Sequence, residues 1–315
     1  MGRAIAIGMA REGARVITNN RHPGSTGHAI LDDSVINSLT QEQKEWVSKL
    51  QEEYKGDAET TTNMIKEIGG EAVPFFGDVS NFEVASKLMQ AAVDSFGKVD
   101  ILVNNVGTFG FSPIWKMTEE LWDHVTIAKP KSHFNCIRHA APIMMEQKWG
   151  RILNCTSRAF LGDIIRHAEY CAANAGVVDL TRAAAIELYP YGITCNAYSP
   201  FAKTRASFEL MAYSMAVDEE DKPFLSSGRP SMKLEDTPSP DYIAPFLVYL
   251  ASEAAANISG SVFNVGGNSI GMYSQPDIAR SLYKEGDPWT MDELSSQAPR
   301  ALFRGYKSPA APPIF

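Results

Sequence analysis

The sequence contains no apolar run of about 18 residues and no charged-then-apolar layout at its N-terminus, so neither a membrane span nor a signal peptide is indicated. Its four cysteines occur without CxxC spacing, which indicates neither a zinc site nor a disulfide framework. The 29 basic residues are outnumbered by 37 acidic ones, which argues against nucleic acid or an anionic membrane as partner. Together these absences favour a cytoplasmic protein with no membrane, nucleic-acid or metal site.

What the sequence does contain is an alternation of β-rich apolar runs with helical patterns. Apolar residues make up 44% of the 315 positions, enough for one large core. Strands separated by helices indicate βαβ units and a parallel sheet, so we predict a single α/β domain. The predicted strands are 15–19, 71–76, 100–106, 151–156, 192–198 and 261–267, and the predicted helical segments are 64–68, 85–96, 118–139, 168–189 and 241–252.

An insertion at 22–57 interrupts this alternation. It is polar and rich in turn residues, and within it residues 40–54 read as an amphipathic helix that begins at a capping box of Thr40 and Gln43. One side of this helix carries apolar residues, which we interpret as local packing rather than a partner site; they are Trp46, Leu50 and Tyr54.

The C-terminal segment 269–315 is a second departure, and we predict that it packs on the main domain, 1–268. Thr290 and Glu293 have the spacing of a capping box, which predicts a short helix. The chain ends in a proline-rich stretch, 308–315, that should be extended.

Six features, taken in chain order, carry a family resemblance. They are GRAIAIGMAREGARVITNN (2–20), GGEAVPFFGDVS (69–80), DILVNNVG (100–107), Ser157 thirteen residues before Tyr170, NAYSPFAKT (196–204) and ISGSVFNVGG (258–267). In this order they resemble the short-chain dehydrogenase/reductases. The insertion and the WTMDEL tail are most similar to a subgroup that includes hydroxyacyl-CoA-type dehydrogenases.

The resemblance implies a Rossmann-like, doubly wound sheet and an oxidoreductase that interconverts alcohols and carbonyls with NAD or NADP. By the same resemblance Tyr170 is the acid/base and Ser157 holds the carbonyl oxygen. The family commonly forms dimers or tetramers through the helices that would hold residues 129 and 170, so an oligomer is expected. The cofactor-binding positions it implies are Gly2, Asn20, Arg21, Asp78, Val79, Asn105, Gly107, Pro200 and Thr204.

The N-terminus departs from the family pattern. Met1 and Gly2 match the last two residues of a Gly-rich turn, while the strand and glycines that precede it in the family are not in this sequence. Without that central strand, its two neighbours would carry unpaired backbone groups, which is costly. Two interpretations stay open: the native polypeptide is longer, or another segment or subunit covers the gap.

The catalytic positions depart as well. Asn174 stands where the family has Lys, and Lys129 stands where the family has Asn, in a helix that Pro130 should kink. If the two residues have exchanged roles, Lys129 restores a positive charge near Tyr170, and a nearby cation favours a phenolate. The alternative is a decayed site with Lys129 in solvent.

The sequence says less about which cofactor, NAD or NADP, is used and about the substrate. Asn20 replaces the acidic residue that would hold the ribose of NAD, and Arg21 could pair with the 2′-phosphate of NADP. Segment 203–240 should cover the substrate, and its apolar stretch 208–215 suits a partly apolar ligand, carboxylated or CoA-linked.

Three functions remain open from the sequence. The leading hypothesis is an oxidoreductase subunit for an alcohol/carbonyl pair, working as a homo-oligomer. The alternative is a pseudoenzyme that stabilises an active homologue in a hetero-oligomer. A nucleotide-sensing regulator, which binds the cofactor without turnover, is the third.

Overall fold

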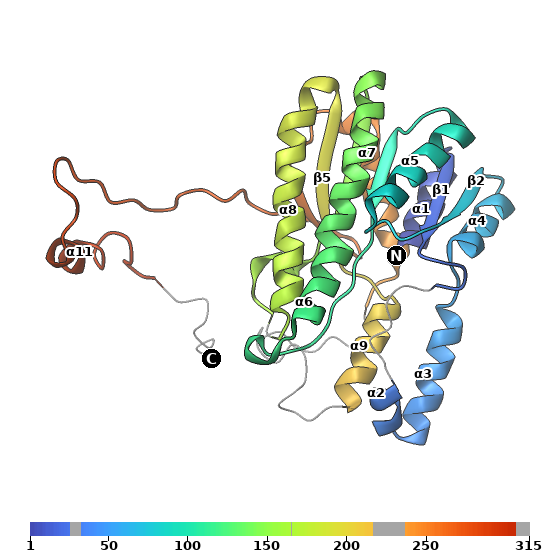
Figure 1. Ribbon diagram of the computed structural model, residues 1–315, viewed down its shortest axis with the longest axis horizontal. Coiled ribbons are helices and arrows are strands. Elements are labelled where there is room, and N and C mark those ends of the chain that lie inside the picture. Colours follow the sequence, from blue (N-terminus) through green and yellow to red (C-terminus); the bar gives the residue numbers. More distant parts are fainter. Residues whose placement is uncertain (26–32, 165, 217–236, 307–315) are drawn as a thin grey trace. The chain divides into compact units, whose positions relative to one another are not determined.

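The computed structural model describes residues 1–25, 33–164, 166–216 and 237–306. The chain forms two compact units, Met1–Tyr273 and Ser274–Phe315. The first unit is a three-layer α/β structure with a mostly parallel sheet between two layers of helices (Figure 1). The predicted α/β, Rossmann-like fold is confirmed.

All six predicted strands form, and each begins and ends within two residues of its predicted bounds. They are β1 (Val16–Asn20), β2 (Ala72–Phe76), β3 (Ile101–Asn104), β4 (Gly150–Cys155), β5 (Ile193–Pro200) and β6 (Val262–Gly266). A seventh strand, β7 (Ser269–Met272), was not predicted and pairs antiparallel with β6. Gly267, with φ of +55°, opens the two-residue connection that allows this hairpin.

The helices of the first unit overlap all of the predicted helical segments. They are α1 (Gly2–Arg11), α2 (Asp33–Ser38), α3 (Gln41–Glu53), α4 (Ala58–Glu67), α5 (Phe82–Phe96), α6 (Glu119–Thr126), α7 (Ser132–Gln147), α8 (Ala168–Leu188), α9 (Arg205–Ala216) and α10 (Ala244–Ala251). Helices α4 and α5 begin earlier than predicted, and α10 begins later. Between α6 and α7 lies a π-helical turn, Ile127–Lys131, which contains Pro130. The irregularity predicted at Pro130 therefore takes the form of a π turn, a feature frequent at functional sites.

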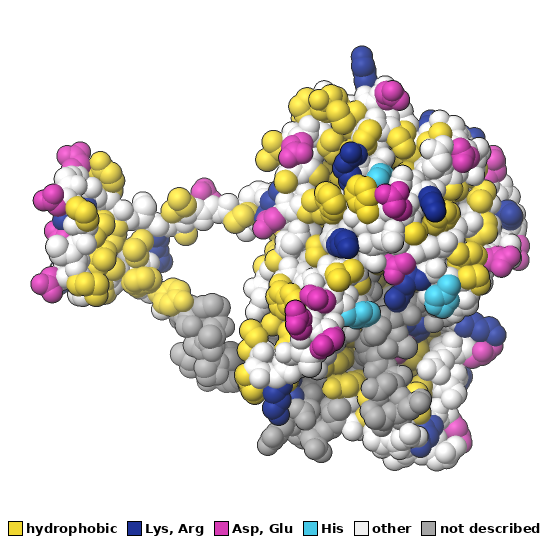
Figure 2. All heavy atoms as spheres, in the orientation of Figure 1, with side chains coloured by type: hydrophobic (Ala, Val, Ile, Leu, Met, Phe, Trp, Pro, Cys, Tyr) yellow, Lys and Arg dark blue, Asp and Glu magenta, His cyan; other side chains and the backbone are white. Residues whose placement is uncertain are grey.

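Two apolar cores lie on opposite faces of the sheet. Helices α5, α7 and α8 pack on one face, with Leu102, Ile152 and Ile193 from the strands. Helices α1 and α10 pack on the other face, with Leu153 and Val265 from the strands. The outer sides of α7 and α8 carry hydrophobic side chains among charged ones (Figure 2).

The strands do not form one continuous sheet. A two-stranded sheet pairs β1 with β2, and a five-stranded sheet has the order β3-β4-β5-β6-β7. Strands β1 and β3 are therefore both sheet edges. This division agrees with the expectation that the neighbours of a central strand would be left with unpaired backbone groups.

The predicted capping boxes of Thr40 with Gln43 and of Thr290 with Glu293 are both present. Helix α3 packs its apolar side on α9, where the Trp46 ring meets the Phe208 ring edge-on at 6.5 Å, so local packing is confirmed. The second unit contains α11 (Met291–Gln297). The proline-rich stretch 308–315 lies outside the described residues. No helix in the described part of the chain is long and apolar enough to cross a membrane.

Candidate functional site

A cavity of about 2000 Å³ opens at the carboxyl ends of β1 and β3 and extends between these two strands. In a parallel α/β sheet the carboxyl ends of strands are where ligands bind. Of the predicted site residues, one does not line this cavity: Asn174. Those that do are Gly2, Asn20, Arg21, Asp78, Val79, Asn105, Gly107, Lys129, Ser157, Tyr170, Pro200 and Thr204.

Tyr170 lies in the first turn of α8, and Ser157 lies just after β4. The Ser157 hydroxyl accepts a hydrogen bond from the Ala159 amide at 3.2 Å, which begins a 3₁₀ turn. The Tyr170 ring packs edge-on against Phe109 with centroids 5.6 Å apart. Both polar side chains are half-buried, so each is held by packing while facing the cavity.

Lys129 lies on the π turn and is only 3% exposed. Its Nζ is 5.9 Å from the centroid of the Tyr170 ring. It also packs on the chain after β3, since a Cβ added at Gly107 would be 3.0 Å from Nζ. Among the described residues, no carboxylate forms an ion pair with this ammonium within 4.0 Å. The structure therefore holds a buried cation beside Tyr170, and not in solvent.

His133, one turn after Lys129, is fully buried and holds the π turn in place. Its Nδ1 lies 2.8 Å from the Lys129 carbonyl oxygen. Burial, and then the charge of Lys129, lowers the pKa of His133 to about 3. The imidazole is therefore neutral near pH 7, and its Nδ1–H donates to the Lys129 carbonyl because a carbonyl can only accept.

Asn174 is fully buried and faces the backbone of its own helix. Its Nδ2 donates to the Tyr170 carbonyl oxygen at 2.7 Å. The Thr156 hydroxyl donates to the Asn174 carbonyl oxygen at 3.0 Å, and its separation from the Asn174 side-chain oxygen is 3.4 Å. The structure thus leaves Asn174 outside the cavity, where it joins the first turn of α8 to the end of β4.

The residues that the resemblance assigns to the cofactor line the part of the cavity near the start of α1 and the carboxyl ends of β1 and β3. The start of α1 contacts the side chain of the residue after β3, since a Cβ on Gly2 would be 3.2 Å from Nδ2 of Asn105. Asn105 accepts a hydrogen bond from the Tyr198 hydroxyl at 3.0 Å. Asn20 donates to the Ser25 carbonyl at 2.8 Å, which leaves the exposed Arg21 as the charged group beside it.

Sequence reasoning missed several polar residues that support the site. Asn135 of α7 donates to the carbonyls of Val79 and Ser80, at 3.0 and 2.9 Å, and so ties α7 to the loop after β2. Glu169 is fully buried and accepts a hydrogen bond from the Gly110 amide at 3.1 Å. The available signal was a polar residue at a helix position that faces the core, because buried polar groups need partners.

Comparisons with known proteins agree with this arrangement. A family model described as Enoyl-(Acyl carrier protein) reductase matches residues 39–267. The chain is 29% identical over 304 residues to the hydroxyacyl-CoA dehydrogenase ChsB1 of Mycobacterium tuberculosis, covering 94% of this chain and 83% of that protein. It is 31% identical over 274 residues to the 3-oxoacyl-(acyl-carrier-protein) reductase FabG of Staphylococcus epidermidis, covering 87% of this chain and 94% of that protein.

A solved structure gives the same result. The crystal structure of a short chain dehydrogenase from Mycobacterium avium superimposes with a TM-score of 0.72 at 29% identity, covering 99% of this chain and 92% of that one. The family match spans more than half of the chain, and the sheet is parallel in the way that the ordered motifs imply. The chain therefore belongs to the short-chain dehydrogenase/reductase family.

Proposed function

We propose that this chain is an NAD(P)-linked oxidoreductase that interconverts a 3-hydroxyacyl and a 3-oxoacyl thioester, with Tyr170, Ser157 and Lys129 as its catalytic residues. One observation carries the proposal: the Lys129 ammonium is buried 5.9 Å from the Tyr170 ring, with no carboxylate partner among the described residues. A buried cation without a counter-ion is costly unless the site presents it with negative charge.

The substrate class rests on the relatives. One is named as a hydroxyacyl-CoA dehydrogenase and another as a 3-oxoacyl-carrier reductase, so both names specify acyl chains on a carrier. In this chain, the rings of Phe109 and His167 line the cavity beside Tyr170, with centroids 5.6 and 6.0 Å from the centroid of the Tyr170 ring. An acyl chain could lie against such rings, because ligand sites are mostly apolar with a few polar groups.

The residues that line the cavity near the start of α1 and the carboxyl end of β1 suit a dinucleotide. The N-terminus of α1 at Gly2 offers backbone N–H groups to a pyrophosphate, and Asp78, the residue that in the family contacts the adenine, also lines the cavity. Arg21 lies where it could meet a 2′-phosphate, which favours NADP over NAD. When bound, the nicotinamide would supply or accept the hydride.

The chain's own residues handle the proton. In the direction of carbonyl reduction, the Tyr170 hydroxyl donates its proton to the carbonyl oxygen, and the Ser157 hydroxyl donates a hydrogen bond to the same oxygen. The negative charge left on the tyrosine oxygen is then stabilised by Lys129. His133 and Asn174 do not act on substrate; they hold the backbone that carries Lys129 and Tyr170.

A second candidate function is a pseudoenzyme subunit that stabilises an active relative. It is favoured by the division of the sheet, which leaves one edge of β1 and one edge of β3 unpaired beside the cofactor residues. In either case we propose a cytoplasmic oligomer, in which α7 and α8 meet another chain. Ile186 on α8 is 77% exposed, a large apolar side chain suited to such a contact.

One assay separates the two candidates. Purified protein is mixed with acetoacetyl-CoA, and the oxidation of NADPH or NADH is followed at 340 nm, with Tyr170→Phe as the matched control. Turnover that the wild type shows and Tyr170→Phe lacks supports the enzyme. Equal, negligible rates for both proteins, with each shown to be folded by circular dichroism, would leave the pseudoenzyme as the function.

A further inference from the structure

Glu169 is a buried acidic residue that the proposed chemistry does not use, although it directly precedes Tyr170 in α8. Its side chain is fully buried, and its Oε1 accepts a hydrogen bond from the Gly110 amide at 3.1 Å. In the part of the chain that the structure describes, no group donates to its other oxygen, Oε2. A buried carboxylate with an unsatisfied oxygen is a poor source of stability, so a role beyond stabilising the fold is indicated.

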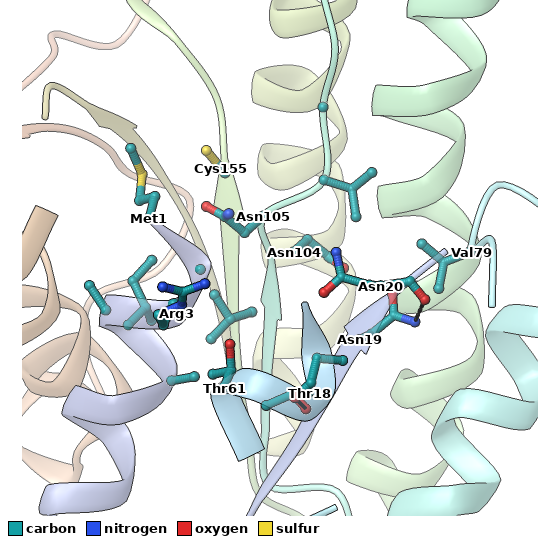
Figure 3. Close-up of a pocket in the computed structure, with 18 of the residues that line it drawn as sticks. Met1, Arg3, Thr18, Asn19, Asn20, Thr61, Val79, Asn104, Asn105 and Cys155 are labelled. Carbon is teal, nitrogen blue, oxygen red and sulfur yellow. Dashed lines mark hydrogen bonds between the residues drawn. The ribbon is translucent and has the colours of Figure 1, made fainter. Parts of the chain in front are cut away.

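The Gly110 amide belongs to the loop 105–113, which follows β3 and forms one wall of the cavity. Figure 3 shows where this loop begins, with the Asn105 side chain extending toward the start of α1. Residues 105–109 all line the cavity. The position of this loop therefore sets the shape of the site.

The same loop contacts two of the proposed catalytic residues. At Gly107 it packs on the Lys129 ammonium, and the Phe109 ring packs edge-on against the Tyr170 ring. Where the loop lies thus limits where the ammonium and the tyrosine ring can lie. A displacement of about 1 Å in an active site can lower a rate by about a hundredfold.

The loop has no regular secondary structure, and two of its backbone amides reach the chain at the start of α8. The Gly110 amide donates to Glu169, and the Ser112 amide donates to the Arg166 carbonyl at 3.0 Å. On its other side the loop is tight against α6, since a Cβ on Gly110 would be 2.4 Å from Cδ1 of Leu121. A segment with few backbone hydrogen bonds opens locally at small cost, so each of these two bonds matters.

His167 packs beside the Gly110–Glu169 hydrogen bond. Its ring is buried, with Nδ1 3.8 Å from Oε1 of Glu169 and its centroid 4.5 Å from that of Phe111. This packing places the hydrogen bond in an interior of low dielectric constant, where it is electrostatically stronger than in water.

The direction of the two neighbouring side chains follows from helix geometry. Successive residues of an α-helix point about 100° apart, so Tyr170 can face the cavity while Glu169 faces the loop. Tyr170 lines the cavity and Glu169 does not. One turn of α8 thus presents the acid/base and fixes the wall beside it.

We propose, on the basis of the oxidoreductase function proposed above, that Glu169 is a positioning residue for the reaction. It holds the loop 105–113 at the distance from α8 that places Lys129 beside Tyr170. It acts through the loop and not on substrate. The feature that matters is an acceptor oxygen at the reach of Oε1, because the Gly110 amide is a donor.

The first test measures kcat and KM for the NADPH-linked reduction of acetoacetyl-CoA by variants of the full chain. Glu169→Met removes the acceptor and Glu169→Asp shortens its reach, so both should lower kcat by at least about tenfold and leave KM within about threefold. Glu169→Gln keeps an acceptor oxygen at the same reach and should recover most of the lost rate. The matched control Glu187→Met, on the exposed side of α8, should stay within about twofold of wild type.

The second test is hydrogen exchange of the Gly110 amide, which needs neither turnover nor cofactor. Exchange should be at least about tenfold faster in Glu169→Met and Glu169→Asp than in wild type, and close to wild type in Glu169→Gln. The Arg151 amide, which donates to the Asp100 carbonyl within the sheet, should not change. A general loss of stability would accelerate both amides.

Lower kcat and faster Gly110 exchange in Glu169→Met and Glu169→Asp, both restored in Glu169→Gln, support the proposal. Three results overturn it: wild-type kcat in Glu169→Asp, a Glu169→Gln variant as slow as Glu169→Asp, or equal acceleration of exchange at Gly110 and Arg151. If the wild type itself shows no turnover, the proposed function fails, and Gly110 exchange alone then decides whether Glu169 fixes the loop.

Discussion

Replacing Lys129 by methionine tests the central feature of the proposed chemistry. Methionine keeps a long, flexible side chain in the buried position and removes the charge. Two unit charges about 6 Å apart interact by roughly 3 kcal/mol at an effective dielectric constant of about 20. With Nζ 5.9 Å from the Tyr170 ring centroid, the variant should lose stabilisation of this order when the tyrosine oxygen becomes negative.

A loss of about 3 kcal/mol in the transition state corresponds to about a hundredfold fall in rate. The assay is the initial rate of NADPH oxidation with acetoacetyl-CoA at saturating substrate, measured from pH 6 to pH 10. In this direction Tyr170 must donate a proton, so raising the pH should not restore the rate of the variant.

Two controls belong to this experiment. Lys131→Met removes a charge from the same π turn, but that side chain is exposed, so its rate should stay within twofold of wild type. Lys129→Arg keeps the charge and should be less impaired than Lys129→Met. Equal rates for wild type and Lys129→Met across the whole pH range would refute the reasoning, and the buried ammonium would then have no part in proton transfer.

Four further expectations follow from the same geometry. The double variant Lys129→Asn with Asn174→Lys should be less active than wild type in the same assay, because Asn174 is fully buried and has no room to present an ammonium to the cavity; a gain in activity would indicate a decayed site. The pKa of His133 is held near 3 by burial, below its ordinary value of about 6.5, so the folded state binds fewer protons than the unfolded state between these values. The contribution of His133 to the free energy of unfolding is therefore fully present above pH 6.5, and it falls by up to about 1.4 kcal/mol per pH unit below that pH. Urea titrations at pH 7 and pH 5 should show this loss in wild type and a smaller loss in His133→Gln. Ile186→Glu should shift the chain toward monomer in light scattering, and unchanged mass would place the interface elsewhere. Fluorescence titration of a polypeptide of residues 1–315 with NADPH should give a dissociation constant weaker than micromolar, because in that polypeptide the phosphates meet backbone N–H groups only from the start of α1; micromolar binding would contradict this.

The strands were predictable from sequence because their burial imposes a pattern. The whole of β4 is buried, and it coincides within one residue at each end with the predicted strand 151–156. Strand β7 gave no such signal, because all four of its residues are exposed and it forms through the hairpin at Gly267. The division of the sheet was expected because the N-terminal residues match the family pattern only from the end of its Gly-rich turn. The shape and lining of the resulting cavity became known only from the structure.

The residues that line the candidate site could be named from the sequence, but their geometry could not. The family resemblance implied that Ser157 and Tyr170 lie together, and both line the cavity. An asparagine within a helix can either face a ligand or hydrogen-bond the carbonyl four residues before it, and sequence cannot decide between these. In the structure, the Asn174 side chain donates a hydrogen bond to the Tyr170 carbonyl oxygen, four residues before it. The position of Lys129 depended likewise on the π turn, whose extra residue changes the direction of the side chains that follow.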